Sequence, residues 1–216
     1  MNYPAGKLQR IVIVLCCLLL YGCHAIPEKK ETKVDTPASL PVPRQESNNV
    51  VSMLDKSPMD IIYFPWEYPK LKMMGKIKTQ PVFRVIYSRP QKNGREVFGA
   101  IVKYGEPWRL GANEGTEIEF FEDVTIQETK VRKGRYLLYC IPRPTDWTLI
   151  MNSDLYSWGL RINAKKDVFK FTVPTMPTDK TIEAFTMETE KTKEGALLWM
   201  AWDDTKVSLA IKTMDQ

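Results

Sequence analysis

Much of the chain after residue 80 alternates apolar and polar residues with the two-residue period of a half-buried β-strand. Four segments show this alternation, at residues 83–87, 117–120, 169–173 and 206–212. Three more segments, at residues 136–141, 147–151 and 196–202, are mostly apolar at odd and even positions alike. This pattern is typical of central strands that are covered on both faces. The pattern therefore predicts a sheet of many short strands.

Turn sequences separate these segments. They are Asn93-Gly94, Lys133-Gly134, residues 142–146, Glu194-Gly195 and Asp203-Asp204. No ten-residue stretch of this region keeps a helical apolar stripe, and the best short helix candidate is residues 96–102. We therefore expect an all-β fold, a single antiparallel β-sandwich of the jelly-roll or Greek-key kind, with one short helix.

The N-terminus has a different pattern. Lys7 and Arg10 precede an uninterrupted apolar run over residues 11–20, which is the layout of a secretory signal and is too short to span a bilayer. Cys23 follows a glycine directly, an arrangement that is similar to a bacterial lipoprotein signal, in which the cysteine is acylated. We predict a signal peptide over residues 1–22 and lipidation at Cys23. An ordinary cleaved signal or an uncleaved anchor is the alternative.

Two segments separate the predicted lipid anchor from the domain. Residues 23–56 are rich in Pro, Lys and Glu and poor in bulky side chains, so they predict a disordered tether. Residues 57–74 place several aromatic residues around Pro65 and Pro69, which predicts an irregular strap against the domain. The alternative for this strap is an exposed docking surface. The β-sandwich domain is expected over residues 75–214.

The composition of the chain excludes several classes of partner and catalytic site. The net charge is +5, and both signs are interspersed along the folded part, so no nucleic-acid partner is expected. Of four cysteines, only Cys140 lies outside the predicted leader and lipidation site, and its apolar neighbours favour a buried core position. The only histidine is His24, so catalytic triads and histidine metal sites lack their imidazole. We expect no cofactor and no metal.

An ordered set of motifs runs from Tyr87 to Gly159. It consists of Tyr87-Ser88-Arg89-Pro90, Asn93-Gly94-Arg95, the run from Tyr104 to Thr116, Gly134-Arg135-Tyr136, Ile141-Pro142, Trp147 and Trp158-Gly159. The set resembles DUF2911, a bacterial family of unknown function that is common in secreted and envelope proteins of Bacteroidota. The resemblance covers residues 75–213 and implies an extracytoplasmic β-rich domain, without supplying a substrate or catalytic residues.

The chain departs from the family pattern at three positions. Lys103 stands where proline is common, Glu128 replaces a turn glycine, and Lys170 replaces a frequent arginine. Because Glu128 replaces a turn glycine, the sequence leaves open how tight the hairpin at this position is.

The motif region also contains the candidate binding residues. They are Arg89, Arg95, Trp108, Arg109, Asn113 and Glu114. Arginine forks suit carboxylate, phosphate or sulfate groups, and an indole face suits a sugar ring, so a small anionic ligand or a glycan is the expected partner. The alternative, which we favour for this stretch, is a structural role. Arg89, Arg109 and Glu114 would then form a buried ion-pair network, with Trp108 in the core.

Catalysis without histidine would need paired carboxylates. Glu114, Glu119 and Asp123 are the weak candidates, although Glu117 and Glu119 fit the solvated face of one strand better. The sequence thus predicts a lipid-anchored binding or structural module of the cell envelope, at the outer membrane. A carboxylate-dependent hydrolase of an envelope or dietary glycan and a protein-docking module are the alternatives.

Overall fold

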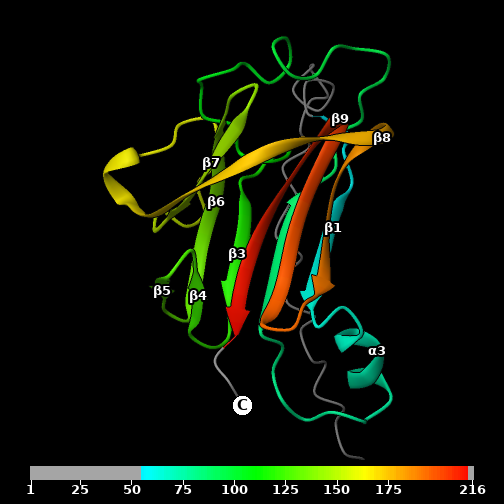
Figure 1. The fold of residues 1–216 in the computed structure, drawn as a ribbon, viewed down its shortest axis with the longest axis vertical. Helices are drawn as coiled ribbons and strands as arrows, with labels where there is room; N and C mark the ends of the chain where they lie inside the picture. The colour runs from blue at the N-terminus through cyan, green and yellow to red at the C-terminus, as the bar shows by residue number, and fades with distance from the viewer. Residues whose placement is uncertain (1–54, 214–216) are drawn as a thin grey trace, which may run out of the picture. The chain divides into compact units, whose positions relative to one another are not determined.

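The computed structural model describes residues 55–213 (Figure 1). The chain divides into two units, residues 1–46 and 47–216, and all described residues belong to the second unit. The predicted signal peptide, Cys23 and nearly all of the predicted tether lie outside the described residues. Within residues 55–213, no helix has the length and apolar character needed to cross a bilayer.

Nine strands make up most of the described region. They are β1 (Met59–Phe64), β2 (Phe83–Ser88), β3 (Thr116–Phe120), β4 (Val124–Ile126), β5 (Thr129–Val131), β6 (Gly134–Pro142), β7 (Asp146–Asn152), β8 (Asp167–Lys191) and β9 (Gly195–Thr213). All strand pairs are antiparallel, in the order β1-β2-β3-β6-β7-β8-β9-β4-β5. A short helix, α3 (Tyr68–Met73), and one 3₁₀ turn, η1 (Ala164–Lys166), complete the elements.

The long strand β8 connects the two halves of the sheet. Its first part pairs with β7, and from Thr175 onward it pairs with β9, with register shifts along the second pairing. Figure 1 shows β8 crossing over the other strands where it passes from one half to the other. Side chains of both halves meet in one core, where Trp147 of β7 and Trp202 of β9 contact the Trp108 ring at 5.7 and 5.8 Å between centroids.

For residues 55–213, the all-β, antiparallel class with one short helix is confirmed. All seven predicted strand segments lie in strands of the sheet. The segments at 196–202 and 206–212 are parts of the single strand β9, because the Asp203-Asp204 pair does not end it: Asp203 takes a left-handed conformation (φ 56°) at an irregularity of the pairing with β8. The described residues thus form one continuous sheet of nine strands.

The predicted position of the helix was wrong. Residues 96–102 form turns around a Phe98–Val102 bridge, because Val97, Phe98 and Val102 are all buried in the core and Gly99 has a φ of 98°. The helix lies instead at α3, with Pro69 in its first turn, where the missing proline N–H is tolerated.

The prediction of an irregular strap over residues 57–74 was also wrong. Its first half is β1, which pairs with β2 from Met59↔Ser88 to Phe64↔Phe83, and its second half contains α3. This register defines the two ends of the domain. The loop end carries residues 89–115, which connect β2 to β3, and the helix end carries α3.

Candidate functional site

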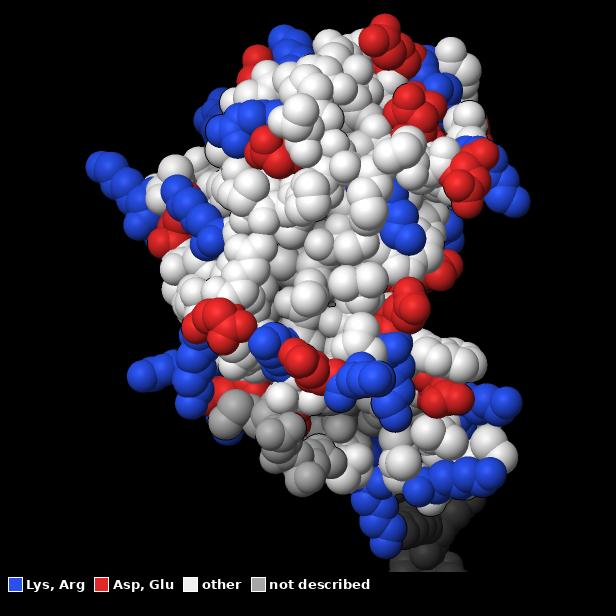
Figure 2. Space-filling model, in the orientation of Figure 1, with Lys and Arg blue, Asp and Glu red and all other residues white. Residues whose placement is uncertain are grey.

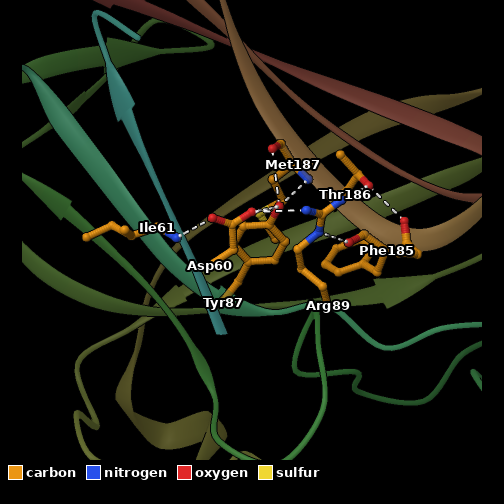
Figure 3. A network of polar contacts seen from close by, with 8 residues as sticks. Asp60, Ile61, Tyr87, Arg89, Phe185, Thr186 and Met187 are labelled. Atoms are coloured by element: carbon orange, nitrogen blue, oxygen red, sulfur yellow. Dashed lines mark hydrogen bonds and ion pairs between the residues drawn. The ribbon is translucent and has the colours of Figure 1, made fainter. Parts of the chain in front are cut away.

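Arg89 holds three elements together at the loop end. Its Nη1 donates to Asp60 Oδ2 of β1 at 3.3 Å, and its Nη2 donates to Thr186 Oγ1 of β8 at 3.0 Å. Its Nε donates to the carbonyl of Phe185 at 3.3 Å. Figure 3 shows these contacts converging between β1, β2 and β8. The guanidinium is therefore occupied in closing the fold.

Tyr87 lies at the centre of the same cluster. Its ring is buried, and its hydroxyl oxygen accepts the backbone N–H of Met187 at 2.9 Å (Figure 3). Burial raises the pKa of Tyr87 to about 12. Asp60, Tyr87, Arg89 and the backbone of residues 185–187 form what we name the seam clamp, because they fasten β1 and β2 to β8.

Trp108 belongs to the core. Its backbone exchanges two hydrogen bonds with Cys140, at 2.8 and 2.9 Å, and its ring packs among four other aromatic rings. Its Nε1 donates to the carbonyl of Gly111 at 3.3 Å. An indole in this position is not an exposed platform for a sugar ring. Cys140 is buried as predicted, and this burial raises the pKa of its thiol.

Two other candidates fasten the backbone of the loop end. Arg95 donates to the carbonyls of Lys92 and Gln91 at 2.9 and 2.7 Å. Asn113 has a left-handed conformation (φ 58°), and its Nδ2 donates to the carbonyl of Asp55 at 2.6 Å. Both contacts stabilise turns of the chain.

Arg109 differs from the other arginines of the motif region. It is half-buried, and its Nε is shielded from solvent without a hydrogen-bond acceptor among residues 55–213. Burial lowers the pKa of its guanidinium, and the negative charge of Asp55 opposes that effect. The predicted ion-pair network was wrong: Arg89 pairs with Asp60, and the described residues provide no ion pair to Arg109 or to the exposed Glu114.

The loop between β7 and β8 packs on Arg109. Gly159 is buried with a φ of 79°, and a Cβ there would lie 2.8 Å from both Cβ and Cδ of Arg109. The neighbouring Tyr156 and Trp158 are exposed to 84% and 45%. Arg135 lies over the Tyr156 ring, with 6.0 Å from its Cζ to the centroid. We name Arg109, Tyr156, Trp158 and Gly159 the Arg109 site.

Sequence reasoning placed Trp158-Gly159 only in the family motif and did not select Tyr156. The sequence feature that could have indicated Tyr156 is its position two residues before Trp158-Gly159, in a turn-rich segment.

The candidate carboxylates have separate structural roles. Glu119 of β3 accepts from Arg84 Nε at 2.7 Å, and its ion pair with Arg84 Nη2 measures 2.6 Å. Asp123 accepts the N–H of Lys133 at 2.9 Å, and this bond together with Lys130 lowers its pKa. A general acid needs the opposite shift. Within the described part of the chain, no group of three or more His, Cys, Asp or Glu could hold a metal ion.

A pocket lies at the helix end. It encloses about 490 Å³ between α3, the turn that joins β8 to β9, and the start of β2. Phe64, Leu71 and Val82 provide apolar walls, and Glu122 contributes a buried Oε1 without a hydrogen-bond partner in residues 55–213. None of the binding or catalytic residues predicted from the sequence lines it.

Comparison with known proteins identifies one family. The sequence profile of the family described as "Protein of unknown function (DUF2911)" matches residues 69–211. No curated protein and no solved structure matches the chain.

Proposed function

Because the chain belongs to the DUF2911 family, a family without an assigned activity, we propose that it is a lipid-anchored module of the cell envelope that binds an anionic ligand. The basic and apolar leader that precedes Cys23 supports the anchor and an outer-membrane location. Two or more acyl chains hold a protein on a bilayer, whereas a single chain binds only reversibly.

The Arg109 site is the proposed ligand site. One observation carries this assignment: a half-buried guanidinium whose shielded Nε has no acceptor in the described region. A planar guanidinium recognises carboxylate, phosphate and sulfate groups through paired hydrogen bonds. Tyr156 and Trp158 are exposed in the loop whose Gly159 packs on Arg109, and they offer ring faces on which a sugar can stack. The favoured ligand class is therefore a sugar that carries an acidic group.

The hydrolase alternative has less support. Glu119 is held by Arg84, and Asp123 accepts the N–H of Lys133 and pairs with Lys130, so each carboxylate already has a structural partner. A binding role requires no acid–base pair and is compatible with a folded region that lacks histidine.

The binding proposal is tested on an array of acidic glycans and simple anions, using the chain from His24 onward. Arg109→Ala should abolish retention of the ligand that the wild type retains, and Arg109→Lys should weaken it strongly because the bidentate fork is lost. Arg161→Ala is the matched control, since Arg161 is an exposed arginine of the β7–β8 loop, which packs on Arg109 through Gly159. Equal retention by all three variants, or no retention by the wild type, would contradict the proposal.

The anchor is tested separately by metabolic labelling with a clickable fatty acid. The wild-type chain should incorporate the label, and Cys23→Ser should not. A labelled Cys23→Ser chain, or an unlabelled wild type, would refute lipidation at this residue without bearing on the Arg109 site.

A further inference from the structure

α3 and the residues directly beside it present large apolar side chains to solvent. Trp66, Met73 and Met74 are exposed to 64%, 81% and 49%. Helical spacing puts Lys70, Met73 and Met74 on one side of this segment, while Tyr68 and Leu71 are half-buried on the side towards the sheet. Trp66 lies in the turn before α3, next to β1. Single exposed apolar residues are common, but three within nine consecutive residues form a patch.

Basic residues surround this patch. Lys70, Lys72, Lys76 and Lys78 are all exposed, and Glu67 is the only acidic residue between positions 66 and 78. None of the four lysines forms an ion pair within residues 55–213. In Figure 2, basic side chains, with an acidic side chain among them, border uncharged ones at the lower right, over the region where Figure 1 places α3. We name residues 66–78 the basic apolar face.

We propose that the basic apolar face lies on the surface of a bilayer that contains anionic lipid. Tryptophan is enriched at the membrane interface, because its ring is largely apolar and its N–H can remain hydrated. Lysine stems can cover apolar surface while their ammonium groups reach lipid headgroups. The charge is complementary to an acidic leaflet, and each lysine near such a surface strengthens binding about fivefold.

This inference rests on the proposed lipid anchor, which would keep the face at high local concentration beside the membrane. An acidic protein is the competing partner for a basic surface. The bilayer is favoured because tryptophan, two methionines and four lysines occur together within residues 66–78, in α3 and directly beside it, and this composition is typical of an interfacial element.

Vesicle co-sedimentation tests the inference on the chain from His24 onward, which cannot carry the lipid. The described region has its own core, so this chain is expected to fold without the leader. The wild type should bind vesicles of phosphatidylcholine with 30% phosphatidylglycerol, and salt should weaken the binding. Lys70→Gln combined with Lys72→Gln should reduce partitioning by about 25-fold.

Lys165→Gln combined with Lys180→Gln is the matched control, because both lysines are exposed and neither lies in the basic apolar face. This control should bind vesicles like the wild type. Brominated lipid should quench tryptophan fluorescence in the wild type and much less in Trp66→Phe. Both readouts use folded protein, which is verified by unchanged thermal unfolding.

Absence of wild-type vesicle binding, or an equal loss in the control pair, would overturn the inference. Capture of an acidic protein through Lys70 and Lys72 without vesicle binding would also overturn it, in favour of a protein partner. Vesicle binding depends on the face alone and fatty-acid labelling on Cys23 alone, so failure of the inference and failure of the anchor give different results.

Discussion

Replacing Tyr87 by phenylalanine removes one hydroxyl from the seam clamp and leaves the ring in place. The ring packs edge-on against Phe185 at 5.8 Å between centroids, and this contact remains in the variant. The hydroxyl oxygen is the acceptor of the buried Met187 N–H. A buried donor without an acceptor costs about 1–3 kcal/mol, so Tyr87→Phe should lower the free energy of unfolding by about 2 kcal/mol at neutral pH.

The same hydroxyl makes stability depend on alkaline pH. Burial raises the pKa of Tyr87 to about 12 in the fold, against about 10 in an unfolded chain. The folded state therefore favours the neutral phenol, and this contribution is complete below pH 10. It is lost as the pH rises from 10 to 12, at up to about 1.4 kcal/mol per pH unit.

Urea unfolding followed by tryptophan fluorescence measures both effects, at pH 7 and at steps up to pH 12. Tyr156→Phe is the control, because Tyr156 is 84% exposed and should leave the unfolding curve unchanged. Other tyrosines also titrate in this range, but they are common to wild type and variant, so the difference between the two curves isolates Tyr87. A Tyr87→Phe loss below about 0.5 kcal/mol at pH 7, or an unchanged alkaline slope, would refute the reasoning.

Three further predictions concern the backbone and the core. In urea unfolding, Gly159→Ala should lower the free energy of unfolding by about 1–3 kcal/mol more than Gly94→Ala. Both glycines have positive φ, but only a Cβ at Gly159 would meet Arg109. Equal losses in the two variants would contradict this packing. Glu128→Gly should raise the free energy of unfolding by about 0.5–1 kcal/mol in the same assay, since Glu128 has a φ of 61°, and a loss would contradict this. Ellman's reagent should label Cys140 only as fast as the protein unfolds, because burial raises its thiol pKa; rapid labelling of folded protein would place that thiol at the surface.

Strands with one buried face were predictable from the sequence, because every second residue faces the core and the apolar residues therefore recur with a period of two. The second part of β8 was not predicted, because its segment around Pro177 carries few buried apolar residues and its pairing with β9 is fixed by the partner strand. The strands β4 and β5, with three residues each, are too short to show a period. Their hairpin is nevertheless tight, with Gln127 and Glu128 both left-handed at the turn.

The contacts of the candidate site could not be predicted from the sequence. The sequence identified arginines with suitable chemistry, but the acceptors of Arg89 lie 29 and 96 residues away, at Asp60 and Phe185. Such partners follow from how β1 and β8 approach each other and not from local spacing. For the same reason, Arg109 could not be distinguished from its neighbours until their partners were known. The packing of Gly159 on Arg109 likewise joins two loops that are separated by β3 to β7.

The two proposed surfaces are compatible in one orientation of the domain. The register of β1 and β2 places residues 89–115 and the start of β1 at one end of these strands and α3 at the other. A domain that rests on α3 would therefore direct the loop that carries Arg109 away from the leaflet, towards solutes. In that orientation, the proposed ligand binding at Arg109 would require no release of the domain from the bilayer.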